Sequence, residues 1–288
     1  MLQNEDICSL IAQHLYPEDI GNVCKVNKWF YNFVNENSSY LYQNCKHKSP
    51  HGIKTHYYDT GEKKCIQTWI DGKREKTWYI WHKNGELKGK YEFKNNNEHG
   101  LWIDWYDNGN VRLYGYFLDG KKTGEWKMYY DDGTVNVRSQ FINDEEDGTY
   151  LSYHPNGTLE MNGTISKNLR TGKWYSWYDS GDVRSRVKYF KNEKVGYCHV
   201  WYENGQKKYK GFYKKNKKHG TWYYYYNTGI IESIEKYKNN YKSGITCVWH
   251  DNGKLAIRGQ YNFGIKDGIW YYYDNDGNIM RKCQYYLE

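Results

Sequence analysis

Aliphatic side chains and long apolar runs are what this sequence lacks most. Mean hydropathy is −1.07, although 19% of the 288 residues are Phe, Trp or Tyr. No apolar stretch is long enough for a membrane-spanning helix, which needs about 18 residues. The start, MLQNEDICSLIAQHL, has acids where a signal peptide needs basic residues, so we expect a helix there. The apolar area must come mainly from aromatic rings, whose OH or NH groups can stay hydrated.

Motifs for metal binding and catalysis are equally scarce. The cysteines number 7 and form no Cys-x-x-Cys pair, which favours free thiols in a reducing compartment. Cys45, His47 and His51 could coordinate a metal, but no second pair has zinc-site spacing, so we expect ordinary surface residues. The sequence has no phosphate loop, nucleophile elbow or paired carboxylates. We therefore expect a cytoplasmic protein that is not an enzyme and has no cofactor or metal.

Glycine, in contrast, is abundant and strictly periodic. One series recurs every 24 residues from Gly61 to Gly277, and a second has the same period from Gly52 to Gly268, interrupted only at Lys76. Units without insertions indicate that each one packs on the next with a fixed geometry, as in repeat arrays. The period is absent before about residue 49. We predict a head at residues 1–48 and an array of ten repeats at residues 49–288.

Each repeat has the pattern of a β-hairpin. Asn-Gly and Asp-Gly pairs supply the positive φ of tight turns, and β-rich runs flank them. Ten hairpins predict an all-β array, a single elongated, twisted antiparallel sheet about 95 Å long at about 4.8 Å per strand. A closed propeller is the nearest competitor, because its blades need about 40–45 residues and some features here recur every 48 residues.

Turns placed at Asn108-Gly109 and Gly120-Lys121 predict the register of a packed face. Gly124 then lies between Phe117 and Phe141, and a ring beside every strand glycine replaces the missing side chain. In the next row, Gly115, Gly163, Gly211 and Gly259 each pair with a Trp eleven positions later, while Val187 and Glu235 accompany the smaller Cys198 and Thr246. A third row pairs Tyr106, Tyr130, His154 and Tyr178 with Val111, Val135, Leu159 and Val183.

The opposite face is predicted to be hydrated, aromatic and basic. Its candidate partner-binding pairs are Trp81 with Lys88, Trp105 with Arg112, Trp177 with Arg184 and Trp201 with Lys208, together with Tyr175 with Arg186 and Tyr271 with Lys282. Four of the 42 Lys and Arg residues and five of the 34 Asp and Glu residues lie in 1–48. The array therefore has 38 basic and 29 acidic residues, a net charge of +9. A protein partner is the main hypothesis, with nucleic acid and anionic lipid as alternatives.

These repeats resemble MORN repeats, in the variant form with Asn-Gly turns followed by Gly-x-Trp-x-x-Trp/Tyr-Tyr. The likeness extends over about residues 49–288. It implies a scaffold or a protein-binding platform, and some members are suspected to contact phospholipid or membrane junctions. Variant arrays occur in bacterial immunity-type proteins and in large DNA viruses of amoebae. If the source is viral, the expected location is the host cytoplasm or the virion.

Residues 4–44 have helical patterning instead, and a helical cap over the edge strand would account for it. The spacing also resembles an F-box, in which the adaptor-binding positions fall on Ile7, Ile11, Leu15, Pro17, Ile20, Val23, Val26 and Phe30. Gln3-Asn4 replaces that family's leading Leu-Pro. The resemblance implies that the head recruits a Skp1-type adaptor of a cullin ubiquitin ligase.

Two functions remain in competition. In the first, the chain is an interaction adaptor, whose head recruits the ubiquitin-ligase adaptor and whose array holds a target protein. In the second, it is a structural protein, such as a viral particle component or a scaffold that assembles through the array.

Overall fold

The computed structural model describes residues 50–286, a part of the chain that contains strands and turns but no helix. The chain divides into two compact units, residues 1–101 and 102–288, and strand β6 (Asn97–Trp105) spans the division. The predicted head and its F-box-like positions lie outside the described residues, so the boundary near residue 48 stays a prediction. The described residues contain no helix long and apolar enough to cross a membrane.

Unit 1 is an antiparallel sheet. Its strands before β6 are β1 (Gly52–Tyr57), β2 (Lys63–Ile70), β3 (Lys73–Arg74), β4 (Lys76–Trp81) and β5 (Leu87–Lys94). β2 pairs with β1 on one side and with β3 and β4 on the other, and β4 pairs with β5. The break between β3 and β4 is at Glu75, next to Lys76, which replaces a repeat glycine and adopts a φ of 58°. A side chain at positive φ is more costly than the glycine found at this position in the other repeats.

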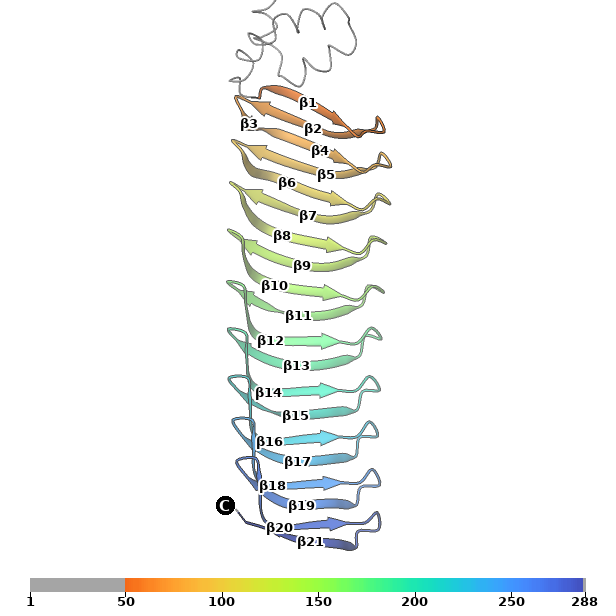
Figure 1. Ribbon diagram of the computed structural model, residues 1–288, viewed down its shortest axis with the longest axis vertical. Coiled ribbons are helices and arrows are strands. Elements are labelled where there is room, and N and C mark those ends of the chain that lie inside the picture. Colours follow the sequence, from red (N-terminus) through yellow and green to blue (C-terminus); the bar gives the residue numbers. More distant parts are fainter. Residues whose placement is uncertain (1–49, 287–288) are drawn as a thin grey trace, which may run out of the picture. The chain divides into compact units, whose positions relative to one another are not determined.

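Unit 2 is a single open antiparallel sheet in chain order, as predicted, and not a propeller (Figure 1). After β6 its strands are β7 (Val111–Leu118), β8 (Lys121–Tyr129), β9 (Val135–Ile142), β10 (Glu145–Tyr153), β11 (Leu159–Ser166), β12 (Leu169–Trp177), β13 (Val183–Phe190), β14 (Glu193–Trp201), β15 (Lys207–Lys214), β16 (Lys217–Tyr225), β17 (Ile231–Lys238), β18 (Tyr241–Trp249), β19 (Leu255–Asn262), β20 (Ile265–Tyr273) and β21 (Ile279–Tyr285). From β7 to β21 each strand pairs with the next.

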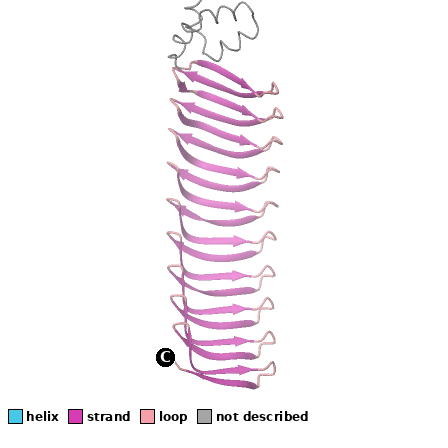
Figure 2. Cartoon of the chain, viewed as in Figure 1, coloured by secondary structure: helices cyan, strands magenta, loops and turns pink. Residues whose placement is uncertain are grey.

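Two kinds of turn alternate along unit 2 and lie on opposite edges of its sheet (Figure 2). On the first edge, two residues with positive φ join the strands, as type I′ turns require; Asn143 (φ 52°) and Asp144 (φ 69°) are an example. The turn predicted at Gly120-Lys121 is wrong by one residue, because the structure has Asp119-Gly120 there. We call this side of the sheet the two-residue edge.

The other edge has three-residue loops, and we call it the loop edge. Gly133 (φ 90°) ends one such loop, and its N–H donates to the carbonyl of Tyr130 at 3.1 Å. This is the hairpin in which a tight turn is followed by a glycine bulge. The extra loop residue shifts the pairing, so the predicted third row is wrong by one position: Tyr129 pairs with Val135, Tyr153 with Leu159 and Trp177 with Val183.

The glycine predicted to lie under an aromatic ring, Gly124, serves the backbone rather than side-chain packing. Gly124 pairs with Phe141, as predicted, but Phe117 pairs with Lys122 instead of Gly124. Gly124 has a φ of 69°, and a Cβ there would meet no atom within 4 Å. The predicted aromatic rescue is therefore wrong, because the glycine is needed for positive φ where the register shifts at a bulge.

The core of unit 2 is a row of tryptophans on the packed face. Trp126, Trp174, Trp222 and Trp270 are 4%, 4%, 0% and 2% exposed. A Cβ on the glycine eleven positions earlier, at Gly115, Gly163, Gly211 or Gly259, would lie 2.2 Å from the ring. The predicted pairing of glycine with tryptophan is thus confirmed. Rings that were expected to cover the strand glycines pack against the tryptophans instead, as Tyr213 does against Trp222 at 4.9 Å.

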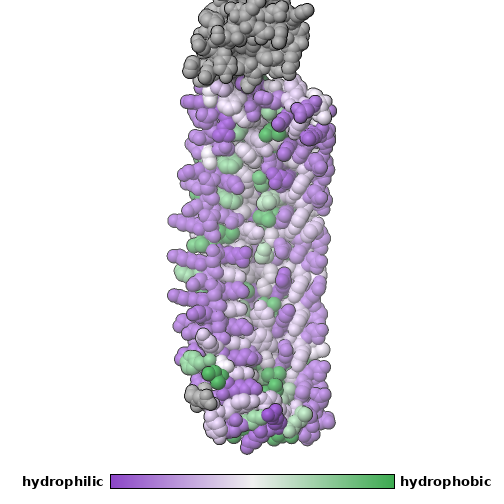
Figure 3. Space-filling view, in the orientation of Figure 1, coloured by the Kyte–Doolittle hydropathy of each residue, from purple (hydrophilic) through white to green (hydrophobic). Residues whose placement is uncertain are grey.

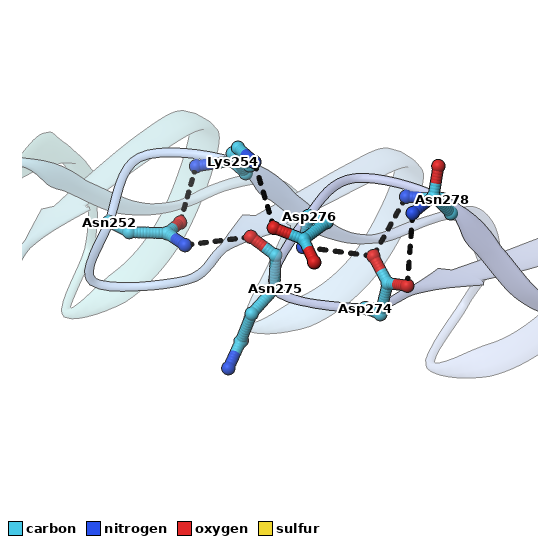
Figure 4. A network of polar contacts seen from close by, with 6 residues as sticks. All are labelled: Asn252, Lys254, Asp274, Asn275, Asp276 and Asn278. Atoms are coloured by element: carbon cyan, nitrogen blue, oxygen red, sulfur yellow. Dashed lines mark hydrogen bonds and ion pairs between the residues drawn. The ribbon is translucent and has the colours of Figure 1, made fainter.

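Hydrogen-bond ladders connect each hairpin to the next. On the loop edge, the Tyr202 hydroxyl donates to the carbonyl of Tyr225 at 3.0 Å, and the bond recurs with Tyr or His in other repeats. On the two-residue edge, Asn216 Oδ1 accepts from the N–H of Lys194 at 2.7 Å. Figure 4 shows a further contact of this kind on the loop edge, in which Asn252 Nδ2 donates to the carbonyl of Asn275 at 2.8 Å. The polar contacts therefore recur every 24 residues, whereas the glycine–tryptophan packing recurs every 48.

Candidate protein-binding surface

The face opposite the tryptophans has a continuous central row, which we call the outer row. Its members are Cα partners across successive strands from β7 to β21: Tyr114, Lys127, Arg138, Leu151, Asn162, Tyr175, Arg186, His199, Lys210, Tyr223, Ile234, Cys247, Arg258, Tyr271 and Lys282. The row contains basic, aromatic and apolar side chains and one amide, Asn162, but no acid. Side chains alternate between the faces of a strand, so the tryptophan row can stay buried while this row stays accessible.

A second row on the outer face, toward the two-residue edge, adds positive charge. Lys173 and Lys188 are directly opposite each other, and both are exposed. Like charges in this position destabilise a sheet. The row does contain acids outside β12–β19: Asp267 of β20 is the partner of Gln260, and Glu125 lies on β8. The oxygens of Glu125 are 2.7 Å from Lys127 Nζ and 2.6 Å from Arg138 Nη2. Burial alone would raise the pKa of Glu125, but these two partners hold it below its ordinary value.

A third row, toward the loop edge, has an aromatic residue on every second strand, each opposite an aliphatic residue or, at Trp201, opposite Lys207. The aromatic members are Tyr129, Tyr153, Trp177, Trp201, Tyr225, Trp249 and Tyr273. Several of these rings stack on the residue two positions earlier. The rings of Tyr175 and Trp177 are 6.1 Å apart at 29°, and those of His199 and Trp201 are 5.8 Å apart at 27°. The view in Figure 3 shows how unit 2 gathers residues of one kind into lengthwise columns, hydrophilic at the margins and paler between them.

The electrostatic character of the outer face is clearest at His199. Burial, followed by the charges of Lys210, Lys207 and Arg186, lowers the pKa of this imidazole. The Arg186 guanidinium lies 5.4 Å from the centre of the Trp201 ring, and Lys210 Nζ lies 4.5 Å from that of Tyr223. Between β12 and β19 the three rows contain basic residues and no acid, so the surface favours an anionic partner.

The same face has a hollow of about 500 Å³ near the C-terminal strands. Ile245 and Ile269, which are 50% and 40% exposed, line it with Arg258 and Tyr271. Exposed apolar residues beside a charged rim are typical of protein interaction sites. The hollow continues the outer row, because Arg258 and Tyr271 are members of both.

The structure separates the predicted pairs of Trp with a basic residue. Trp177 pairs with Val183 and Trp201 with Lys207, because the bulge turns the next residue to the packed face. There Arg184 lies 5.7 Å from the ring centre of Tyr178, and Lys208 lies 5.2 Å from that of Tyr202.

The remaining predicted pairs have different outcomes. Trp81 pairs with Leu87 rather than with Lys88, which is exposed. Arg112 forms an ion pair with Asp104 at 2.6 Å. The predicted pairs of Tyr175 with Arg186 and of Tyr271 with Lys282 are confirmed, with cation-to-ring distances of 6.0 and 5.8 Å.

One set of contacts was missed from the sequence. Lys122, Arg170, Lys218 and Lys266 lie 4.5–4.8 Å from the tryptophan rings on the packed face. Each follows a type I′ turn and precedes its Trp by four residues, a spacing that is visible in the sequence. Over the described strands and turns, no three His, Cys, Asp or Glu side chains come together in a way that could hold a metal ion.

A family model described as MORN repeat variant matches more than half of the chain, at residues 74–95, 98–119, 122–143, 146–165, 170–192, 194–215, 218–239 and 266–285. Hairpin β18–β19 falls between these matches, yet its strands pair in the same register as those of β14–β15. Comparison with curated proteins finds no match.

Solved structures give more distant matches. A crystal structure of TcdB2-TccC3 is 14% identical, with a TM-score of 0.21, and the match covers 78% of this chain and 16% of that one. The structure of TcdB2-TccC3-Cdc42 is 15% identical, with a TM-score of 0.21 and coverage of 78% and 15%. This chain therefore spans only about 16% of the length of the chains it matches.

Proposed function

This chain belongs to the MORN repeat variant family, and we propose that it is a non-enzymatic interaction adaptor whose array binds an acidic target protein on the outer face between β12 and β19. The observation behind this proposal is the absence of acids from three rows of that surface, in which Lys173 and Lys188 are directly opposed. An anionic partner relieves that repulsion. Localisation in the cytoplasm is part of the proposal, and the free thiols of Cys65, Cys198, Cys247 and Cys283 support it.

The composition of the outer face favours a protein over nucleic acid or lipid. Tyr, Trp and Arg are the residues that contribute most binding energy in protein interfaces. Tyr175 and Arg186 are direct partners in the outer row, Tyr223 lies three strands farther along it, and the hollow beside Arg258 offers room for an apolar side chain. A purely electrostatic partner would not need such a hollow.

The experiment is a pull-down from the source cell with the tagged full chain, carried out with and without nuclease treatment. The test variant is Arg186→Asn, Lys210→Asn and Arg258→Asn, because Asn162 already occupies an equivalent position in the outer row. The control removes the same charge from the two-residue edge by Lys167→Asn, Lys191→Asn and Lys215→Asn, because Asn95, Asn143 and Asn239 occupy the equivalent turn position.

We expect a captured protein that is retained by the control variant and lost by the test variant. Capture that survives both variants would contradict the proposal. Capture that disappears on nuclease treatment would assign the surface to nucleic acid instead.

We further propose that residues 1–48 recruit a Skp1-type ubiquitin-ligase adaptor. The support is the F-box-like spacing of the apolar residues in the sequence. A purified Skp1-type protein should co-elute with the full chain in size-exclusion chromatography, and Leu15→Ala with Pro17→Ala should abolish this while the β-sheet circular dichroism persists. A wild-type chain that never co-elutes with the adaptor would leave the head as a cap over the first strands.

A structural role is the second candidate, and one observation favours it. Leu118, Ile142 and Phe190 are 53%, 58% and 57% exposed, and they occupy equivalent positions along the two-residue edge. Ser166 and Lys214 occupy other positions of the same series, so the apolar residues form a local patch through which two copies could join laterally. Sedimentation velocity would then show an oligomer that Leu118→Lys with Phe190→Lys dissociates, whereas a monomer at all concentrations would exclude this route.

A further inference from the structure

One row of cross-strand pairs on the packed face allows side-chain volume to be compared from hairpin to hairpin. It lies next to the tryptophan row, toward the loop edge. Its pairs are Met128–Val137, Ser152–Met161, Ser176–Ser185, Val200–Tyr209, Tyr224–Ser233, Val248–Ile257 and Tyr272–Arg281. Every pair has at least one bulky member except Ser176–Ser185. Among these seven pairs of unit 2, side-chain volume is omitted only at Ser176–Ser185.

An open cavity of about 620 Å³ lies at that place. Ser176 and Ser185 are among its lining residues, and their hydroxyl oxygens are 2.7 Å apart. Met161, Val187 and Val200 give it aliphatic walls. Ligand sites typically have volumes of about 300–1,000 Å³, with mostly apolar walls and a few polar groups, and this cavity has both features.

The charge around the cavity is mainly positive. Arg184 and Lys208 line it and are exposed, while Lys194 is half-buried. The acid of the lining, Glu160, accepts a hydrogen bond from Ser152 Oγ at 2.9 Å. In the hairpin 48 residues later, the positions of Arg184 and Val187 are held by Glu232 and Glu235, so the positive rim is particular to this site.

We propose that this cavity binds a carboxylate attached to an apolar body, presented by a short acidic and aromatic peptide segment. The apolar group packs on Met161, Val187 and Val200, and the carboxylate meets Arg184, Lys208 and a serine hydroxyl. Hydrogen bonds with an ionised partner are stronger than neutral ones, so the positive rim should prefer a carboxylate to a neutral group. The site is separate from the outer row and does not depend on the target proposed there.

The repeats themselves supply the test variants. Ser185→Met fills the cavity and creates the pairing that Ser152 and Met161 already use in the preceding hairpin. Ser176→Val is a second filling variant, because Val200 and Val248 hold the equivalent position. Arg184→Asn with Lys208→Ala removes the charge with the residues found at Asn136 and Ala256. Each substitution is therefore one that the fold accommodates elsewhere.

The probes are acetyl-Gly-Phe-Asp-amide, its Asn counterpart and free phenylacetate, titrated into the full chain by calorimetry. The Asp peptide should bind, and either filling variant or the charge variant should weaken it about tenfold. The Asn peptide should be weaker by a similar factor. The outer-row variant Arg186→Asn should bind the Asp peptide like the wild type, which separates this site from the proposed target surface.

Failure of the wild type to bind either the Asp peptide or phenylacetate would overturn the proposal. So would unchanged affinity in folded filling variants. Binding of phenylacetate without the peptide would overturn the peptide source and leave a small-acid site.

Discussion

Gly163 is where the packing of the array can be tested most sharply. Its backbone is extended, so a side chain brings no penalty from positive φ. A Cβ at this position would lie 2.2 Å from Cδ2 and Cε2 of Trp174. Since carbon contacts are optimal at about 3.5–4.0 Å, the ring would have to move by more than about 1 Å.

The surroundings of Trp174 oppose that movement. The ring is 4% exposed, with Tyr150 at 5.6 Å, Tyr189 at 6.1 Å and the Arg170 guanidinium at 4.7 Å. Overpacking costs about 1–3 kcal/mol, and losing the contacts of a buried aromatic ring costs about 3–5 kcal/mol. We expect Gly163→Val to destabilise β11–β12 by about 3 kcal/mol.

Native-state hydrogen exchange of the β11 and β12 amides is the suitable assay, because repeat arrays open locally rather than as one unit. Thr164→Val is the control, since Thr164 is exposed on the outer face next to Gly163. Adding Trp174→Cys to Gly163→Val copies the arrangement of Val187 and Cys198, so the pair should show favourable coupling of about 0.5–3 kcal/mol. Equal effects of Val at positions 163 and 164 would refute the packing argument.

Further predictions concern pH, the loop-edge ladder and thiol access. The pKa of His199 is lowered in the folded state, so folding favours the neutral imidazole. The free energy of unfolding should therefore fall as the pH drops below about 6.5, and this pH dependence should be lost in His199→Gln. Tyr202→Phe removes the bond to the Tyr225 carbonyl and should cost about 0.5–1.5 kcal/mol in urea unfolding, whereas Tyr197→Phe, at a ring that is 73% exposed, should be neutral. Cys198 is 1% exposed and burial raises its pKa, so maleimide mapping should find it unmodified in the folded protein; rapid labelling would contradict its burial.

The sequence predicted the repeat, the hairpins and the Gly–Trp pairs because these depend on period and volume, which are visible in one chain. It misplaced the turns of the two-residue edge because glycine was taken as the marker of positive φ. In the turn Lys191-Asn192 both residues have positive φ, at 50° and 65°, without any glycine. The preceding repeat stabilises this conformation, since Asn192 Oδ1 accepts a hydrogen bond from the N–H of Arg170 at 2.7 Å. Such a contact depends on packing between repeats and cannot be deduced from the local sequence.

The candidate site was predicted in its composition but not in its pairing. Trp177 and Trp201 were placed on the correct face, while Arg184 and Lys208 were not, because a one-residue bulge reverses the side-chain direction at the loop edge. The same bulge brings these two cations to the cavity beside Ser176 and Ser185. The positive rim of that cavity is therefore a consequence of backbone geometry that residue spacing alone does not reveal.

The central claim is that the outer face holds the target protein, and neighbouring residues on opposite faces test it most directly. Tyr223 belongs to the outer row, whereas Tyr224 stacks on Trp222 on the packed face, with ring centres 6.2 Å apart at 26°. A photo-crosslinking phenylalanine would replace Tyr223 in one full-length protein and Tyr224 in another, each irradiated in the source-cell lysate. We expect the captured protein to crosslink at position 223 and not at 224. Crosslinking at 224 alone, or equally at both, would contradict the account.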